Sequence, residues 1–170
     1  MLLIIGLGTN IGNRRNNLRN AIKNLSDILI IKKVSHIYES KALLQDNAPK
    51  KWDKDFLNMA ILCDSQNAGV PLLNAIKEVE GELGRDLNAP KFSPRIIDID
   101  ILIADSIVIN SDILKVPHSQ LLNRDFALLP ASEVAPKMVF PHTKKTLQEH
   151  LNIMKNFKKI TLKNLGMLDV

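Results

Sequence analysis

The stretch Arg95-Ile-Ile-Asp98-Ile-Asp100-Ile-Leu-Ile103 carries the strongest structural signal in the chain. Successive side chains of a β-strand point to opposite faces, so Asp98 and Asp100 share one face while the isoleucines around them share the other. The pattern therefore predicts a strand over 95–103 that buries one apolar face and holds two carboxylates side by side on the other.

These paired carboxylates favour a cation site. Two neighbouring carboxylates repel each other, and burying them without compensation costs free energy that a divalent cation would offset. Their oxygens suit Mg²⁺, which proteins commonly hold through one or two carboxylates together with substrate phosphates. The alternative is a surface strand with one solvated face. The surrounding isoleucine and leucine, and Arg95 three residues before Asp98, favour the metal site.

The segments on either side predict a sheet covered by helices, from apolar runs and helical periodicity. The predicted strands are Leu2–Leu7, Ile28–Glu39, Phe56–Cys63, Arg95–Ile103 and its hairpin partner Ser106–Ile109, reached across Ala104–Asp105. The predicted helices are Asn13–Leu25, Pro71–Leu83, Pro117–Asn123, Arg124–Val134 (broken at Pro130) and Thr146–Met154. This order, with hairpins in place of helical crossovers, predicts an α+β fold with a ferredoxin-like antiparallel sheet flanked by helices in three α/β/α layers.

The glycine-rich segment Gly6-Leu-Gly8-Thr-Asn10-Ile-Gly12 joins the first predicted strand to the first predicted helix. It superficially matches a dinucleotide-binding turn, but three residues rather than two separate Gly8 from Gly12. The strand–helix alternation of a doubly wound sheet is also missing downstream. The segment is therefore predicted to be a tight turn with Asn10 as a helix cap.

The composition fits one globular domain. The chain has 170 residues, of which 45% are hydrophobic and 24% charged, which excludes disordered and collagen-like chains. We expect the domain to span residues 1–154 and residues 155–170 to form a basic tail or a linker. The apolar runs are too short to cross a bilayer, no export signal precedes them, and the single cysteine favours a reducing compartment. We therefore expect a cytoplasmic protein with no membrane partner.

Positive charge points to an anionic ligand. The net charge is +5, which leaves nucleic acid, nucleotides and acidic metabolites open. The chain has six arginines against 17 lysines, and arginine grips phosphate oxygens in pairs where lysine is a flexible point charge. Arg85, Arg95 and Arg124 lie in the middle segment that holds the aspartate pair. His118, six residues before Arg124, is a further candidate anion contact.

Several motifs together resemble one family. The run Lys91-Phe-Ser-Pro-Arg95-Ile-Ile-Asp98-Ile-Asp100-Ile-Leu resembles the signature of the 6-hydroxymethyl-7,8-dihydropterin pyrophosphokinases of the folate pathway. Further blocks of this family are similar to five segments in the same order: Gly8–Gly12, Asp55–Asn58, Val116–His118, Asn123–Phe126 and Val139–Pro141. The resemblance covers most of the chain and is far more specific than any single motif.

The resemblance implies transfer of pyrophosphate from ATP to the hydroxymethyl group of the dihydropterin, with release of AMP. It implies two Mg²⁺ ions held by Asp98 and Asp100, which with Arg95 form the expected catalytic set. The ATP-binding residues implied are Glu80, Arg85, Arg95, Ile101, His118 and Arg124. The pterin-binding residues implied are Ser40, Leu43, Phe56, Asn58 and Phe126. The expected partners are these two small molecules, with dihydropteroate synthase as a fusion partner or pathway neighbour, and neither nucleic acid nor membrane.

The chain departs from the family pattern at Lys77, Leu87, Ser93 and Ser119, all outside the aspartate pair. Two other interpretations of the sequence remain. Paired aspartates on a ferredoxin-like strand also suit a two-metal nucleotidyl transferase, which would release pyrophosphate rather than AMP. A ferredoxin-like RNA-binding module fits the positive charge, but it would carry a basic-aromatic run that this sequence lacks.

Overall fold

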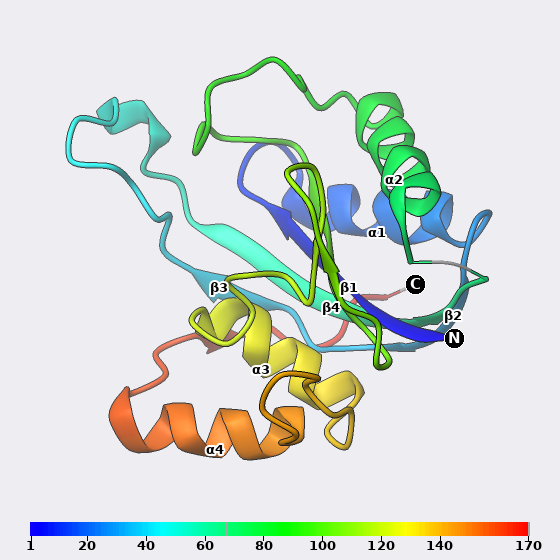
Figure 1. Cartoon of the computed structure of the whole chain (residues 1–170). Helices are drawn as coiled ribbons and strands as arrows, with labels where there is room; N and C mark the ends of the chain where they lie inside the picture. The colour runs from blue at the N-terminus through cyan, green and yellow to red at the C-terminus, as the bar shows by residue number, and fades with distance from the viewer. Residues whose placement is uncertain (67, 170) are drawn as a thin grey trace.

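A computed structural model describes residues 1–66 and 68–169 and shows one sheet between two pairs of helices (Figure 1). The sheet order is β5-β1-β4-β3-β8, with β2 also paired to β4, and every pairing is antiparallel. The strands are β1 (Leu2–Thr9), β2 (Ile30–Val34), β3 (Tyr38–Ser40), β4 (Phe56–Asp64), β5 (Asp98–Ala104), β6 (Ile109–Asn110), β7 (Lys115–Val116) and β8 (Lys163–Asn164). The helices are α1 (Arg14–Leu25), the short 3-10 helix η1 (Lys50–Trp52), α2 (Val70–Glu82), α3 (Asp125–Val134) and α4 (Leu147–Phe157). The predicted three-layer α+β fold is confirmed.

Each face of the sheet has its own hydrophobic core. α1 and α2 cover one face, where Ile97, Ile99 and Ile101 are buried among the apolar residues of both helices. α3 and α4 cover the other face, where Leu102 and Ile103 pack with Leu128 and Leu151. The predicted alternation along the aspartate strand is thus observed, because the isoleucines enter the first core and the aspartates face the side of α3.

A β-bulge locally reverses this alternation at the end of β5. Ile4 pairs with Ile103 but Ile5 pairs with Ile101, which leaves Leu102 as an extra residue. Both Leu102 and Ile103 therefore reach the core beneath α3 and α4. Leu102 lies directly over Gly6, where an added Cβ would come within 3.0 Å of its side chain. Because Gly6 has no side chain, the Leu102 side chain can lie against the backbone of β1. Leu102 thereby closes one end of the aspartate face.

Three predicted elements differ from the structure. Ser106–Ile109 does not form a hairpin with the aspartate strand, because the chain turns away at Asp105 and Ile109–Asn110 pairs with Lys115–Val116 as the separate β6–β7 pair. The predicted long strand Ile28–Glu39 is divided into β2 and β3, because the Ser35 hydroxyl inserts between them and accepts the Ala60 N–H at 2.9 Å. The predicted helix Pro117–Asn123 consists of turns.

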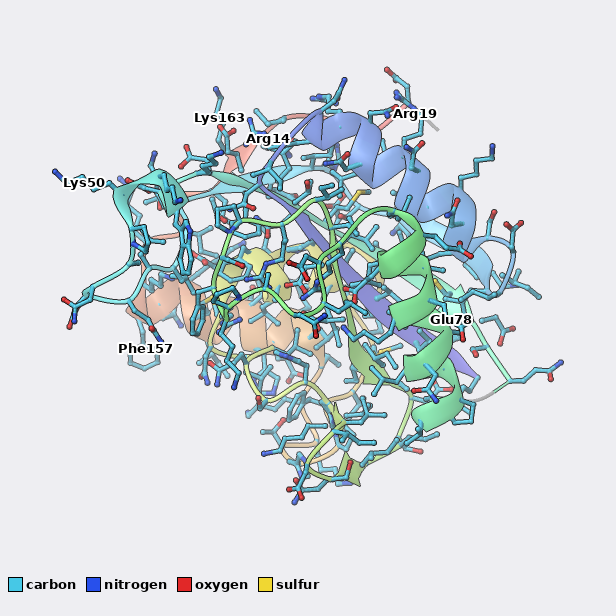
Figure 2. All side chains as sticks on the ribbon, turned by 90° about the horizontal axis from the view of Figure 1, so that it is seen from above. Arg14, Arg19, Lys50, Glu78, Phe157 and Lys163 are labelled. Carbon is cyan, nitrogen blue, oxygen red and sulfur yellow. The ribbon has the colours of Figure 1, made fainter. Side chains whose placement is uncertain are left out.

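Proline does not break α3, contrary to the prediction, since Pro130 lies within the continuous helix 125–134. On the outer side of α2, the charged side chain of Glu78 points to solvent (Figure 2). Among the residues described, no helix is both long and apolar enough to cross a bilayer.

Residues 155–169 pack against the rest of the chain, although the sequence predicts a tail or linker there. The first three complete α4, and β8 then pairs with β3. Leu168 is only 4% exposed and belongs to the first core. Arg15 and Arg19 of α1 donate hydrogen bonds to the backbone carbonyls of Leu165 and Asp169. The segment therefore connects the edge of the sheet to the helical layer behind it.

Candidate active site

A cavity of about 150 Å³ opens on the aspartate face of the sheet, beside the start of α3. Its floor is formed by β1, β4 and β5, and its rim by α3 and by the loops after β3 and before β5. It brings together nine residues predicted from the sequence: Ser40, Leu43, Phe56, Asn58, Arg95, Asp98, Asp100, Arg124 and Phe126. Lys41 and Phe92 also line it and were not predicted as site residues. The predicted pterin-binding and metal-binding groups thus share one cavity.

Two aromatic rings and two guanidinium groups border the cavity. The Arg95 guanidinium lies 6.0 Å from the centre of the Phe56 ring, and that of Arg124 lies 5.7 Å from the centre of the Phe126 ring. The Phe56 and Phe126 side chains are half-buried, so neither is enclosed in a hydrophobic core. The cavity therefore offers apolar surface next to positive charge, which suits a ligand that is flat at one end and anionic at the other.

Asn58 is held in one orientation at the floor of the cavity. Its side-chain Nδ2 donates to the Tyr38 carbonyl at 3.2 Å and to the Ser40 hydroxyl at 2.9 Å. Its Oδ1 accepts no hydrogen bond from the part of the chain that the structure describes, and an added Cβ on Gly8 would lie 3.6 Å from it. The absence of a side chain at Gly8 therefore leaves this acceptor accessible.

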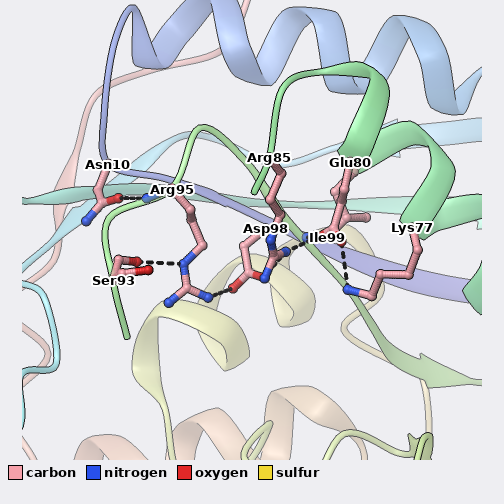
Figure 3. A network of polar contacts seen from close by, with 8 residues as sticks. All are labelled: Asn10, Lys77, Glu80, Arg85, Ser93, Arg95, Asp98 and Ile99. Carbon is pink, nitrogen blue, oxygen red and sulfur yellow. Dashed lines mark hydrogen bonds and ion pairs between the residues drawn. The ribbon is translucent and has the colours of Figure 1, made fainter. Parts of the chain in front are cut away.

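The two aspartates differ in their partners, and Figure 3 shows those of Asp98. The Asp98 carboxylate accepts from Arg85 at 2.5 Å and from Arg95 at 3.1 Å. The Asp100 carboxylate accepts no hydrogen bond and forms no ion pair with any described residue. Burial, and then the charge of Asp98, raise the pKa of Asp100 to about 7. Asp100 is thus an uncompensated carboxylate, which fits a ligand to a divalent cation.

A cation bound here would need ligands beyond this pair. Within residues 1–66 and 68–169, no three acidic, histidine or cysteine side chains are arranged as a metal site. Two protein carboxylates leave most positions of an octahedral ion for water or for ligand oxygens. The donor set is therefore suited to a cation that arrives with, or is completed by, an oxygen-rich ligand.

Glu80 lies behind the cavity rather than in it. Its side chain is 0% exposed and accepts hydrogen bonds from three groups: the Ile99 N–H at 2.7 Å, the Lys77 ammonium at 2.7 Å, and the Arg85 guanidinium. Arg85 thereby bridges Glu80 on α2 and Asp98 on β5, as Figure 3 shows. The structure thus gives Glu80 the position of a residue that orients its neighbours.

Asn10 fixes the beginning of the aspartate strand. Its Oδ1 accepts the Arg95 N–H at 2.8 Å, and its own N–H donates to the Arg95 carbonyl at 3.2 Å. The glycine-rich turn therefore holds Arg95, whose Nε also donates to the Ser93 carbonyl. The prediction that Asn10 caps the first helix is wrong, because the N-cap of α1 is Asn13, whose side chain accepts the Asn16 N–H at 3.1 Å.

Four predicted residues do not line this cavity: Glu80 and Arg85, described above, and also Ile101 and His118. The Ile101 side chain is 4% exposed and faces the first core, so only its backbone could meet a ligand. His118 is half-buried, donates its N–H to the Leu102 carbonyl at 2.7 Å and accepts the Gln120 N–H at its ring Nδ1. Burial, followed by the charge of Arg124, lowers the pKa of His118. The ring is therefore neutral at physiological pH.

A second groove, of about 400 Å³, adjoins the cavity. It runs along the loop between α2 and β5 and is lined by Ile11 and by residues of the segment 84–96, including Arg85. Arg95 and Phe92 line both hollows. Arg95 thus stands between two adjacent spaces, the cavity beside the aromatic rings and the groove along the loop.

Comparison with known proteins places the chain in a family. Residues 4–136 match the model of 7,8-dihydro-6-hydroxymethylpterin-pyrophosphokinase. The chain is 40% identical over 145 residues to the 2-amino-4-hydroxy-6-hydroxymethyldihydropteridine pyrophosphokinase of Aquifex aeolicus, covering 85% of this chain and 87% of that protein. It is 35% identical over 139 residues to the folate synthesis bifunctional protein of Chlamydia caviae, covering 81% of this chain but 31% of that longer protein.

A solved structure has the same fold as this chain. The crystal structure of Plasmodium falciparum HPPK-DHPS with pteroate is similar over 96% of this chain and 47% of that one, with a TM-score of 0.70 and 14% sequence identity. At this identity the likeness concerns the fold alone. From the match to the family model and the identity to the Aquifex enzyme, the chain belongs to the 7,8-dihydro-6-hydroxymethylpterin-pyrophosphokinase family, the pterin pyrophosphokinases of folate synthesis.

Proposed function

We propose that the chain transfers pyrophosphate from ATP to 6-hydroxymethyl-7,8-dihydropterin in a Mg²⁺-dependent reaction that releases AMP. Family membership supports the reaction. The observation that carries the assignment of residues is the single cavity that combines two aromatic rings and a fixed amide with the pair Asp98 and Asp100. A flat heterocycle and its phosphate donor would meet there.

The aromatic end of the cavity is the proposed pterin site. Phe56 and Phe126 would contact the faces of the ring, because stacking suits a flat heterocycle. Asn58 would read its edge, since an amide presents both a donor and an acceptor. Its Nδ2 is engaged by Tyr38 and Ser40, so its Oδ1 is the group left for a donor of the aminopyrimidinone. Ser40 and Leu43 would complete the wall.

Asp98 and Asp100 are the proposed ligands of two Mg²⁺ ions. When bound, Mg²⁺ supplies positive charge to the phosphate oxygens and offsets the charge that develops on them. Arg85, Arg95 and Arg124 would bind the triphosphate, with His118 next to Arg124. Glu80 would orient Arg85 rather than touch ATP, since its carboxylate is fully buried behind the cavity.

The chemistry needs alignment more than covalent assistance. The hydroxymethyl oxygen attacks the β-phosphorus of ATP, the bond from that phosphorus to the oxygen bridging the α- and β-phosphates breaks, and AMP departs with that oxygen. The hydroxyl proton passes to solvent. Positioning and electrostatic stabilisation supply most of the acceleration in such transfers. In this site the ring walls would position the nucleophile, and the arginines would stabilise the developing charge.

The product, a pterin diphosphate, is proposed to be consumed by dihydropteroate synthase. Longer relatives are named folate synthesis bifunctional proteins, and the Plasmodium structure is of an HPPK-DHPS chain. These names describe those proteins. They support the proposal that the product of this chain is likewise the substrate of dihydropteroate synthase.

The test is chromatography of nucleotides after incubating the protein with ATP, Mg²⁺ and the dihydropterin. We expect AMP only when the pterin is present, and no AMP when a chelator removes the metal. Formation of ADP would show ordinary phosphoryl transfer, and release of pyrophosphate would show nucleotidyl transfer. Asp98→Asn and Asp100→Asn should each reduce turnover by orders of magnitude in folded protein, and near-normal turnover in both would overturn the metal assignment.

A further inference from the structure

Lys158 reaches the beginning of α3 from the carboxy-terminal segment, which the sequence predicts to be a tail or linker. It caps the carboxyl end of α4, where its backbone N–H donates to the Met154 carbonyl at 2.8 Å. Its ammonium group lies 3.0 Å from the Asp125 carboxylate. In Figure 1 the chain leaves α4 and passes the beginning of α3 on its way to β8. A charge of the segment after the last helix therefore contacts the helix that borders the cavity.

This ion pair lies directly behind the wall of the cavity. A groove of about 340 Å³ lies on the other side of that wall, and both Lys158 and Asp125 line it. Arg124 and Phe126, the neighbours of Asp125 in the chain, line both the groove and the cavity. Lys158 is therefore bonded to the residue that stands between two predicted substrate contacts.

The Asp125 carboxylate depends on Lys158 for its counter-charge. Asp125 is 7% exposed; its Oδ1 accepts the Phe126 N–H at 3.0 Å, and its Oδ2 is paired with Lys158. Within residues 1–66 and 68–169, Lys158 is the one cation in ion-pair distance of this carboxylate. Removing one partner of such a pair leaves the other charge without compensation. Without Lys158, we expect the carboxylate to turn toward solvent and release the Phe126 N–H.

The beginning of α3 has few other fixed points. The first N–H groups of a helix have no acceptor within the helix, and the N-cap residue Arg124 makes no side-chain cap hydrogen bond. Asp125 supplies one acceptor, and its negative charge suits the positive end of the helix dipole. The backbone that carries the Phe126 ring is thus fixed through Asp125.

We propose that Lys158 is a positioning residue for the pterin, because it holds Asp125 and thereby the Phe126 ring. The inference rests on the proposed function, in which Phe126 contacts one face of the pterin. A stacked ring needs a defined backbone position, since small displacements reduce its contact. The Arg124 guanidinium, at the end of a long side chain, can absorb the same displacement. Lys158 therefore supports binding of the pterin rather than that of ATP.

The test compares three constants in Lys158→Gln. Calorimetry gives the Kd of the dihydropterin in the presence of Mg²⁺ and a saturating α,β-methylene analogue of ATP, and separately the Kd of that analogue. AMP formation with both substrates saturating gives kcat. We expect the Kd of the pterin to rise about fivefold, the upper range for an ion pair with a half-exposed partner, and the other two constants to change by less than about twofold.

Other causes would give a different pattern. General loosening of the site would change all three constants. Loss of positive charge as such would act on the anionic nucleotide, because the pterin carries no net charge at neutral pH. Either pattern, or an unchanged Kd of the pterin, would overturn the inference.

Two single variants control for charge and for side-chain chemistry. Lys159→Gln removes the same charge from the next residue, which is exposed and forms no ion pair with the described chain, and should leave all three constants unchanged. Lys158→Arg keeps the charge and should bind the pterin as the unmodified protein does. An equal loss in Lys159→Gln, or a loss in Lys158→Arg as large as in Lys158→Gln, would contradict the proposed role.

Two double variants test the route through Asp125 and Phe126. In Asp125→Asn the amide oxygen can still accept the Phe126 N–H but needs no counter-charge, so adding Lys158→Gln should not weaken pterin binding further. Lys158→Gln should also have no further effect in Phe126→Ala, because the ring that it positions is gone. Additive losses in either background would show that Lys158 acts by another route.

The proposed pterin site is tested separately by Phe126→Ala alone. If this variant binds the pterin as tightly as the unmodified protein, Phe126 does not contact the pterin and the proposed site fails. If it binds the pterin more weakly while Lys158→Gln shows no change, the site stands and only the role of Lys158 is refuted.

Discussion

Replacing Glu80 by glutamine separates two roles for this residue, because the sequence predicts an ATP contact and the structure buries the carboxylate. The change keeps the shape of the side chain and one acceptor for the Ile99 N–H, but it removes the charge that both Lys77 and Arg85 compensate. Breaking a buried ion pair by removing one partner costs about 3–5 kcal/mol. Arg85 retains Asp98, and Lys77 is partly exposed, so we expect the lower end, about 3 kcal/mol.

The assay is urea unfolding of the protein without ligands, analysed by linear extrapolation. With a slope of about 2 kcal/mol per molar, the loss corresponds to a midpoint lower by about 1.5 M. Glu78→Gln is the matched control, since Glu78 lies on the same helix and points outward (Figure 2), and it should change stability by less than about 0.5 kcal/mol. If Glu80→Gln unfolds at the same urea concentration as the unmodified protein yet binds the ATP analogue more weakly, Glu80 contacts the nucleotide and the positioning role is refuted.

Three further predictions concern the floor of the site, its titration and the carboxy-terminal segment. Asn58→Ala should raise the Kd of the pterin about tenfold, as loss of a buried hydrogen bond implies, and leave the Kd of an ATP analogue unchanged; equal losses in calorimetry would exclude a pterin-specific role. Because the pKa of Asp100 is raised to about 7, the folded state binds more protons than the unfolded state between about pH 4 and 7, so without metal this residue lowers stability as the pH rises. Asp100→Asn should therefore be more stable than the unmodified protein, with a gain that grows over this range and is constant above it; a gain independent of pH in denaturation curves would contradict the raised pKa. Leu168→Ala should cost about 2–3 kcal/mol in urea unfolding because its side chain is buried in the first core, whereas a linker residue would cost nothing.

Local periodicity accounts for what the sequence predicted well. The alternation around Asp98 and the helical spacing of Leu72, Ile76 and Val79 depend on neighbours in the chain, and both faces appear where expected. The pairing of Ser106–Ile109 was wrong because the choice of partner strand is not local: β6 pairs with β7, and the chain that follows returns to β5, where the His118 N–H donates to the Leu102 carbonyl at 2.7 Å. The division of the second strand was missed because it depends on one hydroxyl, that of Ser35, reaching the N–H of Ala60.

The burial of Glu80 could have been anticipated from its spacing. It follows Ile76 by four residues and thus lies on the buried stripe of α2, where a carboxylate requires internal partners. What spacing could not supply is the identity of those partners. Arg85 follows in an irregular loop, and Ile99 lies on a strand whose position relative to α2 is set by the fold. The sequence therefore indicates that the Glu80 carboxylate has internal hydrogen-bond partners, but it does not identify them.

The two aspartates show the same limit at the centre of the site. In the sequence they are equivalent, two residues apart on one face of a strand. In the structure Asp98 lies at the beginning of β5, within reach of the loop that carries Arg85 and Arg95, and both guanidinium groups neutralise it. Asp100 lies two residues further along, beyond that loop, where burial is not compensated by any hydrogen bond from the described chain. The asymmetry comes from the distance each aspartate lies from the loop. A bound cation would therefore stabilise the Asp100 carboxylate more than that of Asp98. Asp98 instead links the positive charges of Arg85 and Arg95 to the site.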